Sequence, residues 1–188
     1  MADFLRDDYP DAAAEVALFL DAISHKILDL QELYTRTFEV QAVTTLGVGY
    51  VLFGDDYKRG ALLSNLNREH NDADNDCRGE LADHLPNVLR LMPKLKDQNL
   101  LEELVEQILV PALMLMIREF DPARIAKKNA NYLKHYKTLI DPASGCDSTI
   151  YCLMLKAVLH VLAKDFPVTE TMTRLSDWSS RPQTVDFL

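Results

Sequence analysis

The sequence has 188 residues, of which 48% are hydrophobic and 26% are charged, and its formal net charge is −9 at pH 7. A chain of this length and composition can bury enough apolar surface to form a core without disulfides or a metal. The acidic balance argues against nucleic acid or an anionic membrane as the main partner, because both would repel the chain. A basic peptide remains an electrostatically favourable partner, and the charge is equally consistent with a role in solubility alone.

The cysteines and the apolar segments indicate a cellular compartment. Cys77, Cys146 and Cys152 are scattered and form no Cys-x-x-Cys pair, which fits a reducing cytosol better than a disulfide framework or a zinc ribbon. Residues 1–10 contain no basic segment followed by an apolar one, so we expect no secretory signal. The longest apolar run, 108–117, is shorter than the roughly 20 residues that cross a bilayer. We therefore expect a cytoplasmic protein without stable membrane insertion.

Apolar residues recur every three or four positions along most of the chain, which predicts amphipathic helices. The first helix is expected over 11–30, and its apolar face continues through Tyr34 and Phe38. No segment alternates strictly between apolar and polar residues, so the sequence predicts no strand.

The next apolar stripe covers 43–53 and ends at Gly54, where a helix would stop. Asp55 and Asp56 stand where the following helix would begin. The glycines within 47–49 lie inside this helical pattern, and close helix packing is their expected role.

Residues 67–80 form the most polar stretch, and we expect a loop over 71–79 because Asn and Asp compete with helical hydrogen bonds. His70, Cys77 and the nearby aspartates suggest a metal site, but their spacing lacks the Gly and the closing Glu of a calcium loop. A solvated loop is the favoured interpretation. The other His and Cys spacings match no ligand set, so we expect no metal ligand and no cofactor.

Two further helices follow the polar stretch. The first is expected over 81–95, with Pro86 in its opening turn, where a missing N–H costs nothing, and Asp83 near the positive end of the dipole. The second, over 97–120, is apolar on nearly all sides at its middle and is expected to be the central buried helix, kinked at Pro111.

Asp121 and Pro122 predict another helix start, an N-cap followed by proline, and a last helix is expected over 151–162. These periodic segments together predict an all-α fold, a single-domain bundle of about seven to eight helices. The domain is expected over 1–166, followed by a loosely attached tail over 167–188.

The segment 80–86 combines acidic, basic and apolar residues at a loop-to-helix junction, where function often resides. Asp83 and His84 invite an acid–base interpretation, but no nucleophile lies nearby in the sequence and no phosphate-binding glycine loop occurs. Helix capping is the simpler interpretation of Asp83 on residues alone. We assign no catalytic residue.

The junction Glu80-Leu-Ala-Asp-His-Leu-Pro86 resembles the Glu-x-x-Asp-His/Tyr-Leu segment of the redox-enzyme maturation chaperones. This family includes the nitrate reductase delta-subunit (NarJ) type and the trimethylamine-oxide and dimethyl-sulfoxide reductase chaperones (TorD and DmsD). In the same order, 34–39 is similar to the family's Tyr-x-x-x-Phe-Asp element and 50–55 to its Tyr-x-Leu-Phe/Tyr-Gly-Asp element. The resemblance covers about 19–162, with Ala82 where many relatives have proline.

The resemblance implies a TorD/NarJ-like helical fold and a cytoplasmic chaperone that is not an enzyme and has no cofactor of its own. Its partner would be the N-terminal peptide of a molybdoenzyme catalytic subunit, held while the molybdenum cofactor is inserted and before export or membrane attachment. No nucleic acid is expected, and a monomer is favoured over a dimer. A groove between helices would take the apolar side of the peptide, and acidic groups at its rim would steer its basic side. The expected peptide-binding residues come from the matching segments: Tyr34, Phe38, Tyr50, Phe53, Asp55, Asp56, Glu80, Leu81, Asp83, His84, Leu85 and Pro86.

Two other functions remain open. One is a general helical scaffold for protein interactions. The other is a nucleotide-binding hydrolase that uses Asp83 and His84, which the missing phosphate loop disfavours. The sequence does not identify the client enzyme, and nitrate reductase is the nearest analogy.

Overall fold

The computed structural model describes residues 2–136 and 147–166. Helices are the only regular secondary structure in these ranges, so the all-α prediction is confirmed. The one-turn α1 (Ala2–Leu5) is left aside, η1 (Met92–Lys94) is counted with α6 (Leu85–Leu91), and the continuous α7 (Gln98–Glu103), η2 (Leu104–Leu109) and α8 (Val110–Arg118) are counted as one. By this count the described ranges contain eight helices. The expected tail, 167–188, lies outside the described residues.

Two compact units make up the fold. Of the described residues, the first unit contains 2–45, 116–136 and 147–164, and the second contains 46–115 with 165 and 166. The first unit is built from α1 (Ala2–Leu5), α2 (Pro10–Ala22), α3 (Ile27–Phe38), α9 (Pro122–Tyr136) and most of α10 (Tyr151–Asp165). The second is built from α4 (Val48–Phe53), α5 (Tyr57–Asp72), α6 (Leu85–Leu91), η1 (Met92–Lys94), α7 (Gln98–Glu103), η2 (Leu104–Leu109) and most of α8 (Val110–Arg118).

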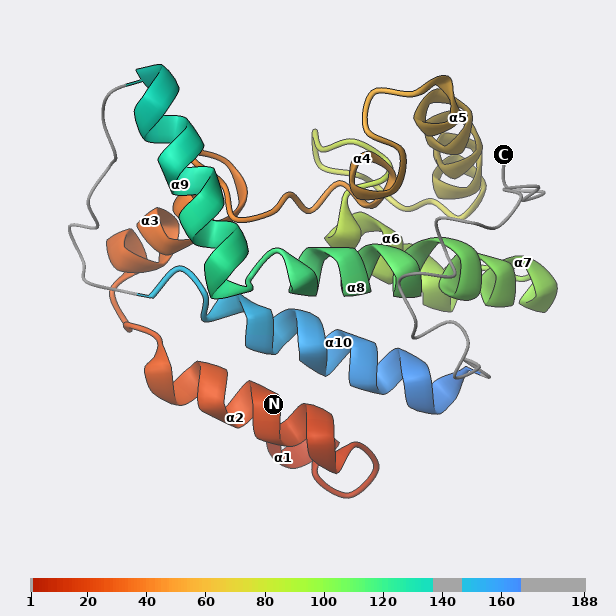
Figure 1. The fold of residues 1–188 in the computed structure, drawn as a ribbon. Coiled ribbons are helices and arrows are strands. Elements are labelled where there is room, and N and C mark those ends of the chain that lie inside the picture. Colours follow the sequence, from red (N-terminus) through yellow and green to blue (C-terminus); the bar gives the residue numbers. More distant parts are fainter. Residues whose placement is uncertain (1, 137–146, 167–188) are drawn as a thin grey trace. The chain divides into compact units, whose positions relative to one another are not determined.

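Small side chains bring α2 and α10 together in the first unit. The two helices lie side by side (Figure 1), and Ala12 and Val16 of α2 form a buried cluster with Ala157 of α10. Alanine allows the two backbones to approach closely, which suits an apolar face built from small residues.

The prediction of one helix over 11–30 is wrong, because α2 ends at Ala22 and α3 begins at Ile27. Ser24 Oγ donates to Asp29 Oδ2 at 2.6 Å and accepts from the Lys26 N–H at 3.1 Å. These local hydrogen bonds offer the backbone an alternative to the helix. The apolar spacing continues across the break, so periodicity alone could not reveal it.

In the second unit, the predicted boundary between α4 and α5 is confirmed. Gly54 ends α4 with φ 62°, a conformation that favours glycine, and Asp56 caps α5 by accepting the Lys58 N–H at 2.9 Å. The expected helix over 81–95 begins only at Leu85, with Pro86 in its first turn as predicted. The four residues before Leu85 form a turn instead, because they pair with the segment that leads into α4.

The long apolar helix is confirmed as a buried element, and its backbone is irregular just before Pro111, where a kink was predicted. Leu104, Ile108 and Leu113 are completely buried. A π-helical turn, η2, precedes Pro111, and Val110 donates its N–H to Val105 O, five residues back. Pro111 has no N–H to donate, so a widened turn next to it is a physically reasonable accommodation.

Candidate functional site

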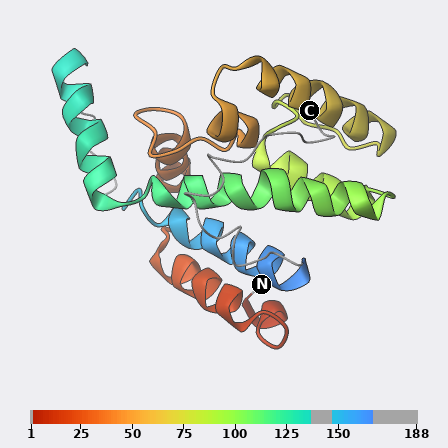
Figure 2. The ribbon, with the colours of Figure 1, turned by 45° about the vertical axis from the view of Figure 1, so that its right-hand side comes forward.

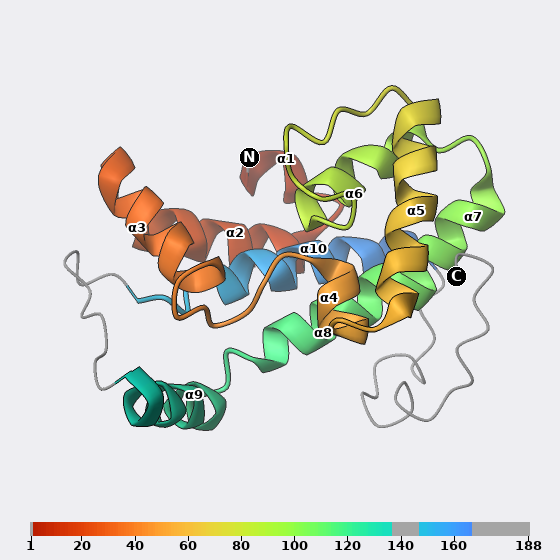
Figure 3. The ribbon, with the colours of Figure 1, turned by 90° about the horizontal axis from the view of Figure 1, so that it is seen from above.

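An isolated antiparallel bridge joins the predicted junction to the start of α4. Gly47 pairs with His84, and the flanking backbone groups make two hydrogen bonds. Val48 N–H donates to Asp83 O at 2.9 Å, and Leu85 N–H donates to Leu46 O at 2.8 Å. The bridge therefore fixes the end of the junction on the turn that begins α4. Figure 3 shows the loop after α5 running back to α6 at this point.

Asp83 is a buried half of an ion pair. Its side chain is completely buried, and Oδ2 accepts a hydrogen bond from Arg59 Nε of α5 at 3.1 Å. The other oxygen, Oδ1, is buried and has no hydrogen-bond partner among the described residues. The Arg59 guanidinium also lies 5.2 Å from the centre of the Tyr50 ring, within the range of a cation–π contact. Arg59 thus links the buried carboxylate to an exposed aromatic ring.

Gly49 makes room for this carboxylate. A Cβ at position 49 would lie 2.8 Å from Asp83 Oδ2, closer than real Cβ atoms approach, and 3.0 Å from Leu62 Cδ2, a tight contact. The predicted packing role of 47–49 is therefore confirmed at Gly49. Gly47 instead precedes the helix and carries the bridge.

A buried polar network holds the loop between α5 and α6. His70 Nδ1 lies 2.8 Å from Asn75 Nδ2, and Nε2 lies 3.0 Å from Ala82 O. Asn75 Nδ2 also donates to Asn87 O at 3.1 Å, so His70 Nδ1 accepts and Nε2–H donates. The neutral imidazole thus joins the end of α5 to the junction.

The interpretation of 71–79 as an entirely solvated loop needs correction. His70, Asn75 and Asn87 are buried, whereas Asp72, Asp74 and Asp76 are exposed. Within the residues that the structure describes, no group of three or more His, Cys, Asp or Glu side chains is arranged to hold a metal ion. A high asparagine content predicts a loop. It does not show whether an asparagine side chain is solvated or donates hydrogen bonds to buried backbone carbonyls.

The predicted peptide-binding residues fall into three classes of exposure. Phe38, Asp83 and Leu85 are buried; Tyr34, Phe53 and His84 are half-buried; Tyr50, Asp55, Asp56, Glu80, Leu81 and Pro86 are exposed. The burial of Asp83 removes it from the expected acidic rim. Asp83 does not cap α6 either, because His84 holds the N-cap position and makes no side-chain capping bond.

The same residues are divided between the two units. Tyr34 and Phe38 belong to the first unit, where their rings are 5.2 Å apart and both approach Tyr151. Phe19 completes this aromatic cluster, with its ring 5.3 Å from that of Tyr151. Tyr34 and Phe38 are therefore part of the packing of the first unit. The other ten predicted residues belong to the second unit.

We define the junction surface as the exposed residues on either side of the bridge in the second unit: Tyr50, Glu80, Leu81 and Pro86. Tyr50 and Leu81 are 45% and 55% exposed, so both offer apolar area at the surface. Tyr50 is three residues after Gly47, and Leu81 is three residues before His84. Both therefore lie near the bridge that Gly47 and His84 form. The acids at 55 and 56 follow α4. A fixed backbone thus presents aromatic, aliphatic and acidic groups.

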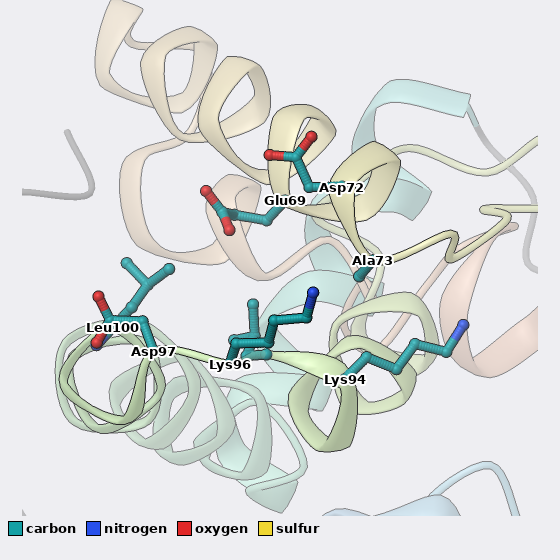
Figure 4. Close-up of a pocket in the computed structure, with 8 residues that line it drawn as sticks. Glu69, Asp72, Ala73, Lys94, Lys96, Asp97 and Leu100 are labelled. Carbon is teal, nitrogen blue, oxygen red and sulfur yellow. The ribbon is translucent and has the colours of Figure 1, made fainter.

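Two pockets lie elsewhere. One, of about 180 Å³, lies between the end of α5 and the segment after α6. Figure 4 shows Lys96 pointing from that segment toward α5, which carries Glu69 and Asp72. The other, of about 410 Å³, lies beside α9 in the first unit. Neither is lined by a predicted peptide-binding residue, so neither is the expected groove.

Two thiols in the described ranges are not activated. Burial raises the pKa of Cys77, with opposing effects from Arg90 and Asp76. Burial likewise raises the pKa of Cys152, where Lys156 acts in the opposite sense. A raised thiol pKa leaves less thiolate at neutral pH, which disfavours a nucleophilic role.

Comparison of the chain with models of protein families, with curated proteins and with solved structures found no match. The resemblance to the redox-enzyme maturation chaperones therefore remains a prediction from motifs.

None of the helices in 2–136 and 147–166 is both long and apolar enough to cross a bilayer.

Proposed function

We propose that this chain is a molybdoenzyme maturation chaperone that binds the N-terminal peptide of a catalytic subunit at the junction surface. The observation that carries the proposal is the construction of the segment with the closest resemblance, 80–86. A buried ion pair and a backbone bridge fix this segment, while Glu80, Leu81 and Pro86 remain at the surface.

The chemistry of the junction surface supports a basic, partly apolar peptide as the ligand. Tyr50 and Leu81 offer apolar contact area, which supplies most of the affinity in peptide recognition. Glu80 and the acids at 55 and 56 are exposed and would steer a basic peptide. The net charge of −9 also attracts a basic peptide at long range.

Rigidity is the second supporting property. Arg59 contacts both Asp83 and Tyr50, so the ion pair that fixes the junction also restrains the exposed ring. A restrained surface loses less conformational entropy when a ligand binds. The burial and pairing of Asp83 also disfavour the alternative hydrolase, because its carboxylate is not exposed to a substrate.

A maturation assay tests the proposal. A molybdoenzyme from the same organism is produced with and without this chain, and the molybdenum content of the purified catalytic subunit is measured. We expect the molybdenum content to fall when the chain is omitted, and to be restored by the wild-type chain. Equal molybdenum loading with and without the chain would contradict the proposal and favour the general scaffold.

A further inference from the structure

Helix α9 has a charge opposite to that of the whole chain. It carries four cations (Arg124, Lys127, Lys128 and Lys134) and, near its end, His135. No Asp or Glu occurs anywhere in 122–140, although the chain as a whole has a net charge of −9. An uninterrupted basic segment in an acidic protein is a strongly charged local surface.

The cations of α9 share one face. Successive residues of a helix are about 100° apart, so the basic side chains and Asn131 fall within an arc of about 120°. We call this face the basic stripe: Arg124, Lys127, Lys128, Asn131, Lys134 and His135. All six residues are exposed, whereas Ile125 and Tyr132, on another face, are half-buried. In Figure 2, α9 extends away from α2 and α10 of the same unit.

Part of the basic stripe is engaged within the chain. Glu119 Oε1 accepts from Arg124 Nε at 2.9 Å, and Glu119 Oε2 lies 2.8 Å from Lys128 Nζ. Lys128 also donates to Val43 O. Lys127 and Lys134 are exposed and lie seven residues apart on the stripe, a rise of about 10 Å along the helix. Within the described residues neither ammonium group makes an ion pair, so both can reach a partner.

A pocket lies beside the basic stripe on α9. It has a volume of about 410 Å³. Helix α9 lines it with Lys128, Asn129, Asn131, Tyr132 and His135, and the opposite side carries Gln41, Ala42 and one acid, Glu39. Amide, hydroxyl and imidazole groups can hydrogen-bond to a carboxylate or amide side chain. The pocket therefore provides a recess next to the cations for a polar side chain of a ligand.

We propose that α9 is a docking helix for an acidic segment of a partner protein. Charge complementarity selects this occupant. An anionic membrane is disfavoured because the net charge of −9 repels it. Ile125 and Tyr132 are also half-buried, which leaves Leu133, 45% exposed, as the large apolar side chain that α9 presents to solvent. Nucleic acid is disfavoured because the net charge of −9 repels it. The site lies on a different unit from the junction surface and has the opposite charge, so it adds a second partner to the proposed function.

Fluorescence anisotropy with fluorescein-labelled decaglutamate at low salt tests the proposal. The double variant Lys127→Glu/Lys134→Glu should bind the probe at least about tenfold more weakly than the wild-type chain, because two attractions become repulsions. The control Lys26→Glu/Lys96→Glu makes the same charge change at exposed positions outside α9 and should bind within about twofold of wild type. Lys127→Gln/Lys134→Gln should give an intermediate loss. Helix content from circular dichroism should match in all of the variants.

Three results would overturn the proposal: no binding of decaglutamate to the wild-type chain, equal weakening in the control, or tighter stripe-dependent binding to phosphatidylserine vesicles or to a single-stranded oligonucleotide. Binding of a basic peptide at the junction surface should be unchanged in the stripe variant. The two proposals can therefore fail separately.

Discussion

Arg59 Nε lies 3.1 Å from Asp83 Oδ2, and this contact pairs a completely buried carboxylate with a cation that also contacts an exposed ring. A buried charge is strongly unfavourable without a partner, so the pair commits the junction and α5 to one arrangement. Asp83, the acid of the motif, is therefore a buried structural residue. Its neighbours Glu80 and Leu81 are exposed and can contact a ligand.

The first prediction concerns the stability that this pair confers. Asp83→Ala leaves Arg59 without its carboxylate and should lower the free energy of unfolding by about 2–4 kcal/mol, as measured by urea denaturation. Asp21→Ala removes an exposed carboxylate from α2 and should change stability by less than about 0.5 kcal/mol. The double variant Asp83→Leu/Arg59→Met should recover much of the loss, since it removes both charges. A loss for Asp83→Ala no larger than that of the control would show that the pair is not structural.

The second prediction compares two glycines. Gly49→Ala would place a methyl group 2.8 Å from Asp83 Oδ2 and 3.0 Å from Leu62, and should destabilise the protein by about 1–3 kcal/mol through overpacking. Gly60→Ala in α5 meets no atom within 4 Å and should stabilise it by about 0.5–1 kcal/mol, because alanine favours the helix. Thermal melts of the two variants should shift in opposite directions. Equal shifts would contradict the close approach at Gly49.

The sequence predicted the helical class and several boundaries because those features depend on local chemistry. Gly54 and Asp56 act on backbone groups within a few residues of themselves, and Asp121 likewise caps α9 by accepting the Ala123 N–H at 2.9 Å. The break at Ser24 was missed because the apolar spacing continues across it.

The site was predicted less well because its construction is non-local. Asp83 and Arg59 are 24 residues apart, so the ion pair cannot be inferred from local sequence. An aspartate just before a helix has the same sequence signature whether it caps the helix or pairs with a buried cation. The bridge between Gly47 and His84 joins segments 37 positions apart (84 minus 47). Neither segment has the alternating apolar pattern that would predict a strand. The burial of His70 in the last turn of α5 was not predicted, because its hydrogen-bond partners, Asn75 and Ala82, come from the loop and the junction.

The third prediction concerns pH and Glu119. Partial burial acts to raise the pKa of Glu119, but the hydrogen bonds and charges of Lys128 and Arg124 outweigh it and lower the pKa below its ordinary value. A lowered carboxyl pKa stabilises the folded state above the unfolded pKa, and this contribution is lost as the pH falls through the folded pKa. Glu119→Gln should therefore lower stability at pH 7 by no more than about 1 kcal/mol. The difference from wild type should vanish in acid, and a difference that persisted there would contradict the ion-pair origin.

The fourth prediction concerns the thiols. Burial raises the pKa of both Cys77 and Cys152. In a Cys146→Ser variant, both should react with iodoacetamide at pH 8 several-fold more slowly than free cysteine, because little thiolate forms. In denaturant both should react at the rate of free cysteine. A thiol that reacted faster in the folded chain would show activation that these surroundings do not provide.

The most direct test of the central claim is isothermal titration calorimetry with the N-terminal peptide of a molybdoenzyme catalytic subunit from the same organism. We predict one-to-one binding that weakens moderately with added salt, because screening acts on exposed charges and spares apolar contact. Glu80→Lys/Leu81→Ala should abolish most of the binding. Asp21→Lys/Leu18→Ala, which makes the same changes in α2, should leave it intact, since Leu18 is 58% exposed and Leu81 55%. Equal losses in the two double variants, or equal binding of a scrambled peptide, would contradict the assignment of the junction surface as the peptide site.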